Sequence, residues 1–154
     1  MRILFVCMGN ICRSPTAEAV VRAKLDEAGL ADRILIDSAG TGDWHVGKAP
    51  DPRACEAAAC RGYDLSALQA RQVSPDDFHQ FDLILAMDHD NLTRLQAQRP
   101  GDARAEVDLL LRRYGADVDE VPDPYYGGAE GFEYVLRLIE QAADGLLAEA
   151  RRRL

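Results

Sequence analysis

Short apolar runs along the chain alternate with longer segments whose apolar residues recur every three or four positions. The runs cover residues 3–6, 34–36, 83–87 and, less clearly, 106–111. Runs this short, without alternating polar residues, are typical of parallel strands that are buried on both faces. The pattern therefore predicts a parallel sheet of three strands, or of four if the last run is also a strand.

The segments between these runs predict helices. Ser14 and Pro15 mark the start of the first one, with Ser14 as N-cap and Pro15 at the first helical position, and Gly29 marks its end. Further helices are predicted at 52–61, from 74–77 onward, at 88–98 and after Gly128. Alternating strands and helices give right-handed crossovers and a sheet that helices cover on both faces. We therefore expect a single-domain α/β fold over residues 1–154, a three-layer sandwich.

Composition and charge narrow the class of protein. Of the 154 residues, 47% are hydrophobic and 29% are charged, which allows a substantial core and argues against disorder. The net charge is −8, whereas binding to nucleic acids or anionic membranes favours a basic face. We expect neither as a partner. An anionic substrate would need a local positive site that works against the overall charge.

Cysteine usage indicates the compartment. The four cysteines are Cys7, Cys12, Cys55 and Cys60, and the apolar run that begins at Ile3 is too short for a signal peptide. A membrane span needs about 20 apolar residues, and no stretch approaches that length. We expect a cytoplasmic protein with reduced thiols. Sixteen Arg against two Lys suggests a GC-rich bacterial genome.

The loop after the first strand carries the strongest chemical signal. Cys7 and Arg13 stand six residues apart between a strand and a helix, and Gly9 permits a tight turn. Backbone N–H groups in such a loop can converge on an anion, reinforced by the helix N-terminus. The guanidinium of Arg13 matches two phosphate oxygens, and the same positive field favours the thiolate of Cys7. This context predicts covalent phosphoryl transfer, although each residue alone would suggest only a strand-end Cys and a surface Arg.

The stretch from Val6 to Pro15 closely resembles the phosphate loop of the low-molecular-weight protein tyrosine phosphatases. The resemblance continues at residues 37–41, 70–72, 87–88 and 121–126. It implies a four-stranded parallel sheet with flanking helices, Cys7 as nucleophile and Arg13 as phosphate clamp. It implies no metal and no cofactor. The phosphate-binding residues would be Met8, Gly9, Asn10, Ile11, Cys12, Arg13 and Ser14.

The same resemblance implies that tyrosine-phosphorylated proteins are the substrates, with a cognate tyrosine kinase as a further partner. It makes Asp123 the general acid and base. A carboxylic acid helps a phenolate to leave, and Pro122 and Pro124 stiffen the backbone around Asp123. Without the resemblance, a turn Asp beside prolines would explain the residue equally well. The rival acids Asp117, Asp119 and Glu120 are interpreted as a solvated loop.

Trp44, Tyr125 and Tyr126 are aromatic residues in two predicted loops. By analogy they wall a slot for a phosphorylated phenol ring, and the alternative is that they anchor their own loops. Asn10, Ser14 and Ser38 match positions that brace the phosphate loop. Ser14 is expected both to cap its helix and to support the Cys7 thiolate, and the alternative is a role as N-cap alone.

Cys12 matches a thiol that can trap an oxidised Cys7 as a disulfide, and the alternative is a small buried apolar role. One departure from the family pattern lies near residues 70–72. A His commonly precedes these residues in the family and helps to brace the phosphate loop, whereas this chain has Leu68 there. The bracing network is therefore in question.

Other functions remain as alternatives. An arsenate reductase of the same fold would relay oxidation through further thiols, but Cys55 and Cys60 are poorly placed for this. A phosphoarginine phosphatase would resemble this loop with Thr where Ile11 stands. A non-hydrolytic phosphocarrier would have no use for Asp123. The three scattered His residues form no zinc pattern, so we expect no metal.

Overall fold

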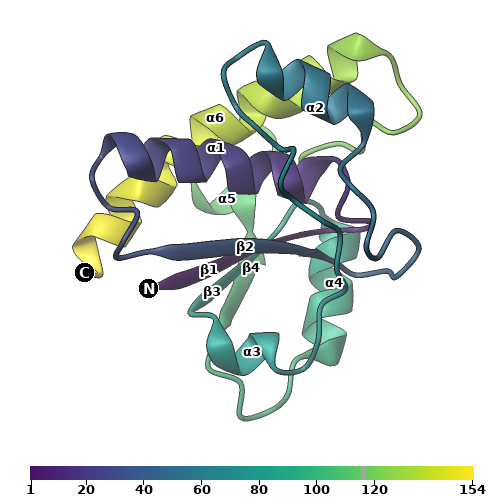
Figure 1. Cartoon of the computed structure of the whole chain (residues 1–154). Coiled ribbons are helices and arrows are strands. Elements are labelled where there is room, and N and C mark those ends of the chain that lie inside the picture. The colour runs from purple at the N-terminus through teal and green to yellow at the C-terminus, as the bar shows by residue number, and fades with distance from the viewer. Residues whose placement is uncertain (116) are drawn as a thin grey trace.

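The computed structural model describes residues 1–115 and 117–154, and in it strands alternate with helices as predicted (Figure 1). In chain order the elements are β1 (Arg2–Cys7), α1 (Arg13–Glu27), β2 (Leu35–Gly40), α2 (Pro52–Ala59), α3 (Asp77–Gln80), β3 (Leu83–Ala86), α4 (His89–Gln98), β4 (Glu106–Leu109), α5 (Leu110–Arg113) and α6 (Ala129–Arg152).

The four strands form one parallel sheet in the order β2-β1-β3-β4. β1 lies between its two neighbours, with Cys7 opposite Gly40 of β2 and Val6 opposite Ala86 of β3. From β1 the chain moves outward to β2, then crosses back over β1 to β3 and continues outward in the opposite direction to β4. Ligands of such sheets bind at this reversal point, beyond the carboxyl ends of the strands. Cys7 is the last residue of β1 and lies there.

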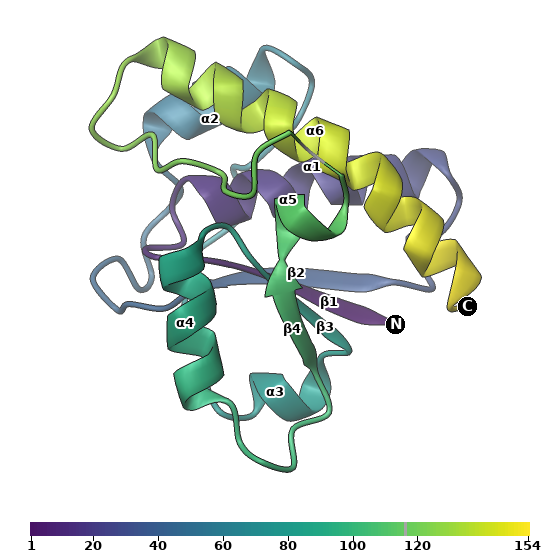
Figure 2. The ribbon, with the colours of Figure 1, turned by 180° about the vertical axis from the view of Figure 1, so that it is seen from behind.

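Helices cover both faces of the sheet, which confirms the predicted three-layer α/β fold. α1, α2, α5 and α6 lie on one face, and α3 and α4 lie on the other (Figures 1 and 2). Side chains of β1 alternate between the two cores, with Ile3 and Phe5 toward α1 and α6 and Leu4 and Val6 toward α3 and α4. All four are buried, so the unbroken apolar run reflects burial on both faces.

The fourth predicted strand is confirmed only in part, and one predicted helix cap was wrong. The apolar run at 106–111 divides, because β4 ends at Leu109 and Leu110 begins α5. Leu110 and Leu111 are buried, so this run signals burial without distinguishing strand from helix. The N-cap of α1 is Cys12, so Ser14 lies inside the first turn instead of capping it. The Ser14 hydroxyl instead contacts the Cys7 sulfur, which agrees with the position beside the thiolate that the family resemblance implies.

The end of β2 packs directly against the backbone of the loop that follows β1. A side chain at Gly40 would place its Cβ 2.7 Å from the carbonyl oxygen of Met8 and 3.2 Å from the backbone nitrogen of Asn10. Its N–H donates to the Arg71 carbonyl at 2.8 Å, which adds the segment around residue 71 to the same support. Only a glycine lets β2 approach the loop this closely.

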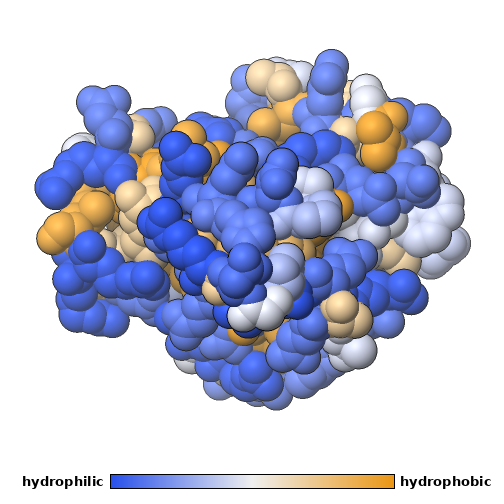
Figure 3. All heavy atoms as spheres, turned by 90° about the horizontal axis from the view of Figure 1, so that it is seen from below, coloured by the Kyte–Doolittle hydropathy of each residue, from blue (hydrophilic) through white to orange (hydrophobic). Residues whose placement is uncertain are grey.

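The face that carries α3 and α4 is mostly hydrophilic, with small separate apolar patches (Figure 3). Among the described helices, none combines the length and the apolar character that a membrane crossing requires.

Candidate active site

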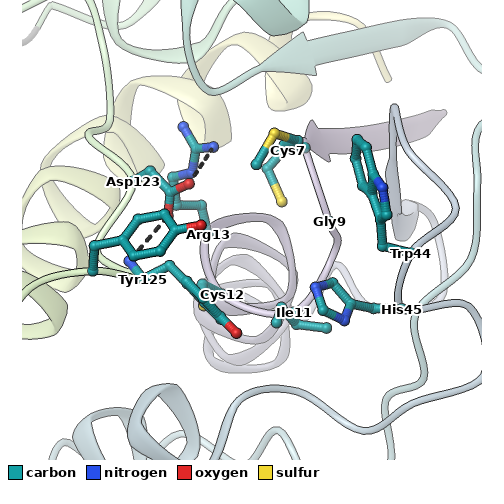
Figure 4. Close-up of a pocket in the computed structure, with 11 residues that line it drawn as sticks. Cys7, Gly9, Ile11, Cys12, Arg13, Trp44, His45, Asp123 and Tyr125 are labelled. Carbon is teal, nitrogen blue, oxygen red and sulfur yellow. Dashed lines mark hydrogen bonds and ion pairs between the residues drawn. The ribbon is translucent and has the colours of Figure 1, made fainter.

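A cavity of about 400 Å³ opens where β1 ends (Figure 4). Trp44 and His45 lie on one side of it and Asp123 and Tyr125 on the other, with Cys7 between them (Figure 4). Its lining comprises Cys7, Met8, Gly9, Ile11, Cys12, Arg13, Trp44, His45, Asp123, Tyr125 and Tyr126. The fold therefore brings together loop 7–13, the loop after β2 and the loop before α6.

The sulfur of Cys7 is held by two hydrogen-bonding groups. The backbone N–H of Asn10 donates to it at 3.2 Å, and the Ser14 hydroxyl lies 3.0 Å away. That hydroxyl oxygen accepts from the Asn10 side-chain amide at 2.8 Å, so its own proton can be donated, either to the sulfur or to the more distant Ala39 carbonyl at 3.4 Å. Both groups can therefore donate to a thiolate, the form of cysteine that attacks phosphorus.

Asn10 connects the loop to the rest of the domain. Its backbone is left-handed, with a φ of 58°. Its amide nitrogen donates to Ser14 and, at 3.0 Å, to the Ser38 hydroxyl, while its amide oxygen accepts from the backbone N–H of Arg71 at 3.0 Å. Three segments distant in sequence therefore converge on one side chain.

Ser38 is held from its other side by a carboxylate. Its hydroxyl donates to buried Glu18 at 2.7 Å, and Arg22 donates to the second oxygen of that carboxylate, also at 2.7 Å. Leu68, at the position where a His was expected, is half-buried and packs against the core on the α1 face. The bracing network is thus complete without a histidine, because Glu18 and Arg22 secure Ser38.

Arg13 is buried, and its guanidinium is oriented by its partners. One nitrogen, Nη1, donates to Asp88 at 2.6 Å and to the carbonyl of Val121 at 3.0 Å. The other terminal nitrogen, Nη2, lies 3.8 Å from an oxygen of Asp123. Burial opposes the charge, but the nearby Cys7 and Asp88 outweigh it and raise the pKa of Arg13. The cation is therefore permanent and fixed in direction.

Asp88 was expected at the start of the predicted helix at 88–98 and within the family-like stretch 87–88, but no role in the site was assigned to it. One carboxylate oxygen caps α4 by accepting from the backbone N–H of Asn91 at 2.8 Å, while the other binds Arg13. A capping signal uses one oxygen and says nothing about the second, so sequence patterns could not reveal the contact with Arg13.

Asp123 is the carboxylate that the structure places in the cavity. It is partly exposed, and its Oδ1 accepts from the backbone N–H of Tyr125 at 3.0 Å. Asp117, Asp119 and Glu120 line a separate hollow beside His89, where Glu120 accepts from the backbone N–H of His89 at 2.8 Å.

The aromatic residues line the cavity mouth. Trp44 and Tyr126 are largely exposed, at 64% and 91%, and Tyr125 is exposed to 38%. A side chain at Gly42 would overlap the Trp44 indole, so a glycine there allows the ring to lie against the backbone. His45 was not singled out from the sequence. A lone His in a polar loop gives no signal beyond its neighbour Trp44, yet its ring centroid lies 6.5 Å from that of Tyr125.

Comparison with known proteins agrees with this geometry. A family model described as "Low molecular weight phosphotyrosine protein phosphatase" matches residues 2–154. The chain belongs to this family. A low molecular weight protein-tyrosine-phosphatase of Streptomyces coelicolor is 47% identical, over 99% of this chain and 95% of its own length.

Solved structures of the family superpose closely. A protein tyrosine phosphatase from Entamoeba histolytica, crystallised with Hepes in its active site, has a TM-score of 0.94 at 38% identity, over 99% of this chain and 97% of that chain. A drosophila arginine phosphatase has a TM-score of 0.91 at 31% identity, over 98% of each chain. Proteins with different stated activities therefore share this phosphatase fold.

The second cysteine of the phosphatase loop differs sharply from Cys7 in its surroundings. Cys12 is 6% exposed. Burial, followed by the charges of Asp51, Cys7 and Asp123, raises its pKa to about 12. Cys12 is therefore a neutral thiol at physiological pH. Within residues 1–115 and 117–154, no cluster of three or more His, Cys, Asp or Glu side chains is arranged to hold a metal ion.

Proposed function

We propose that this chain is a protein-tyrosine phosphatase that works through a cysteinyl-phosphate intermediate. One observation carries the proposal: the Cys7 sulfur receives hydrogen bonds at the floor of a cavity whose opposite wall holds Arg13 beside Asp123. A nucleophile, a fixed cation and a carboxylic acid are the groups that cleavage of a phosphate ester requires.

In the first step, the Cys7 thiolate attacks phosphorus and forms an S–P bond while the P–O bond to the tyrosine breaks. Arg13 and the N–H groups of residues 8–14 stabilise the charge on the phosphoryl oxygens. Asp123, protonated at this stage, donates its proton to the departing phenolate.

In the second step, Asp123 is ionised and accepts a proton from a water molecule that attacks phosphorus. The S–P bond breaks, inorganic phosphate leaves and the Cys7 thiolate returns. Ser14 and the Asn10 N–H stabilise this leaving thiolate, so the groups that activate the nucleophile also assist its release.

The walls of the cavity favour a phosphorylated phenol ring. Trp44 and Tyr125 present aromatic surface between which such a ring can stack, and Tyr126 extends that surface outward. A phosphoarginine phosphatase is the second candidate, because a structural neighbour is described as an arginine phosphatase. Ile11, which lines the cavity, favours the tyrosine substrate.

The thiol arrangement disfavours an arsenate reductase. Cys55 is half-buried with its sulfur 3.8 Å from the carbonyl of Pro50, and Cys60 is exposed beyond the end of α2. Neither of these cysteines lines the cavity. A phosphocarrier is disfavoured because Asp123 would have no role in it.

We propose further that residues 1–154 act as one cytoplasmic phosphatase domain on tyrosine-phosphorylated proteins, opposing a tyrosine kinase. Four free cysteines support a reducing compartment. The net charge of −8 disfavours nucleic acid and anionic membranes as partners.

Cys12 is proposed as the residue that captures oxidised Cys7. Peroxide converts the Cys7 thiolate to a sulfenic acid, and the Cys12 thiolate then attacks that sulfur and displaces hydroxide, forming a disulfide. Because the pKa of Cys12 is raised to about 12, only a small fraction of the attacking form is present at neutral pH.

A substrate panel tests the assignment. We expect rapid turnover of a phosphotyrosine peptide and of p-nitrophenyl phosphate, and no reduction of arsenate. Phosphoarginine should be turned over at no more than about one tenth of the rate of the phosphotyrosine peptide, because its guanidinium offers less surface to the aromatic walls. Cys7→Ser should abolish turnover yet still bind phosphate. Preference for phosphoarginine, or activity that survives Cys7→Ser, would contradict the proposal.

The role of Asp123 predicts a leaving-group dependence. Asp123→Asn should lower kcat/KM, which reports the first chemical step, by about 10²–10⁴-fold for phenyl phosphate and far less for p-nitrophenyl phosphate, because p-nitrophenolate leaves without a proton. Glu120→Gln, in the neighbouring hollow, is the matched control and should alter neither rate. Equal losses on both substrates in Asp123→Asn would remove Asp123 from the role of acid.

The redox proposal predicts a pH dependence. After brief peroxide treatment, the rate of Cys7–Cys12 disulfide formation should rise about tenfold per pH unit from 7 to 9, following the thiolate fraction of Cys12. Dithiothreitol should restore activity, less completely in Cys12→Ser and fully in Cys55→Ser. Peptide mapping that finds Cys7 linked to Cys55, or a pH-independent rate, would overturn this pairing.

A further inference from the structure

Arg53, the second residue of α2, lies between two aromatic rings at the edge of the active-site cavity. Its guanidinium carbon is 5.4 Å from the ring centroid of Tyr125 and 4.9 Å from that of Phe132. Phe132 is a buried residue of α6, whereas Tyr125 lines the cavity. The guanidinium therefore joins a fixed ring of the core to a ring of the proposed substrate slot.

A carboxylate fixes the position of that guanidinium. Asp51 accepts hydrogen bonds from Arg53 Nε at 3.1 Å and from Nη2 at 2.9 Å. This bidentate contact fixes the orientation of the guanidinium relative to the carboxylate. Asp51 is 8% exposed, and its backbone N–H donates to the carbonyl of Ile11 at 2.8 Å. Arg53 is thereby held at a defined place relative to the phosphate loop.

The segment that carries Tyr125 has local backbone hydrogen bonds. The N–H of Tyr125 donates to the Asp123 side chain, and the N–H of Gly127 donates to the Pro124 carbonyl at 3.0 Å. These bonds shape the turn but do not attach it to α2 or to the phosphate loop. The direction of the Tyr125 ring depends on what its side chain touches. The centroids of the Tyr126 and His45 rings lie 5.0 and 6.5 Å from that of Tyr125, and the Arg53 guanidinium, fixed by Asp51, is the charged group in contact with the ring.

We propose that Arg53 is a positioning residue that holds the Tyr125 ring as a wall of the slot and so favours phosphate esters of aromatic alcohols. The inference rests on the proposed function, because it assigns a cause to the slot through which that function selects its substrate. Arg53 touches neither the phosphorus nor the nucleophile. Its effect is on the binding of the ring and not on the chemical step.

The chemistry of the site requires arginine. A planar guanidinium can stack on two rings while its edge binds a carboxylate, whereas the ammonium of lysine is a compact charge that cannot do both. Arg53→Lys should therefore behave more like Arg53→Met than like the unchanged protein, although it keeps the positive charge.

The test separates ring binding from phosphate binding. In Arg53→Met, KM for a phosphotyrosine peptide should rise about two- to fivefold, the range expected for a partly exposed cation–π contact. We expect kcat to change by less than about twofold, since uniform binding is what is lost. The inhibition constant of inorganic phosphate should stay unchanged, because phosphate has no ring.

Arg61→Met is the matched control. Arg61 follows the same helix and binds Glu133 and Glu140 of α6 at 3.2 and 2.6 Å, so it also joins α2 to α6, but it is not in contact with Tyr125. Its KM should equal that of the unchanged protein. A rise in KM of equal size in both variants would show a general effect of loosening α2, and would overturn the proposal.

A double substitution completes the design. In a Tyr125→Leu background, Arg53→Met should cause no further rise in KM, because the ring that it positions is gone. Additive effects, an unchanged KM in Arg53→Met, or a parallel change in the phosphate inhibition constant would each contradict the role of Arg53. Failure of the proposed function is recognised separately, as absence of phosphotyrosine turnover in the unchanged protein. Thermal unfolding of each variant checks that it folds. If Arg53→Met does not fold, Arg53→Lys supplies the same comparison of KM with the phosphate inhibition constant.

Discussion

The side-chain amide of Asn10 holds the phosphate loop in a conformation on which the rest of the site depends. A left-handed backbone costs an ordinary L-residue roughly 1–2 kcal/mol, and Asn10 adopts it with a φ of 58°. The amide contacts Ser14, Ser38 and the Arg71 backbone, and each buried hydrogen bond contributes about 1 kcal/mol. These contacts offset the local strain. They also turn the Asn10 N–H toward Cys7, so one residue both shapes the loop and supports the nucleophile.

In a protein with a net charge of −8, the proposed binding of an anion at this site depends on local organisation. α1 begins at Arg13, so its N-terminal N–H groups and dipole face the cavity. Asp88 accepts a hydrogen bond from one terminal nitrogen of Arg13 and thereby fixes the plane of the guanidinium. The other terminal nitrogen still faces the cavity, beside Asp123. Burial strengthens each of these interactions, because little water is present to screen them. The global charge affects the approach of substrates and other partners, and the loop determines what binds.

Sequence reasoning succeeded where a short stretch of residues is compatible with one structure. The apolar runs predicted all four strands, although the run at 34–36 covers only the start of β2, and the residues between the first strand and helix predicted the loop that lines the cavity. It failed where one residue serves two partners. The capping rule misplaced Ser14, although the family resemblance had already indicated its contact with Cys7. Asp88 caps a helix with one oxygen and binds Arg13 with the other. The contact between Asp88 and Arg13 joins residues 75 positions apart, so no pattern within a short window contains it. The contact between Arg53 and Tyr125 belongs to the same class.

The most direct test of covalent phosphoryl transfer is to find the phosphoryl group on the enzyme. Asp123→Asn should form the intermediate readily from p-nitrophenyl phosphate and hydrolyse it slowly, since the base for the second step is missing. Rapid denaturation during turnover, followed by peptide mass spectrometry, should then find one phosphoryl group on the peptide that contains Cys7, and at the Cys7 sulfur. A phosphoryl group on any other residue, or continued turnover with unmodified Cys7 at every sampled time, would contradict the account.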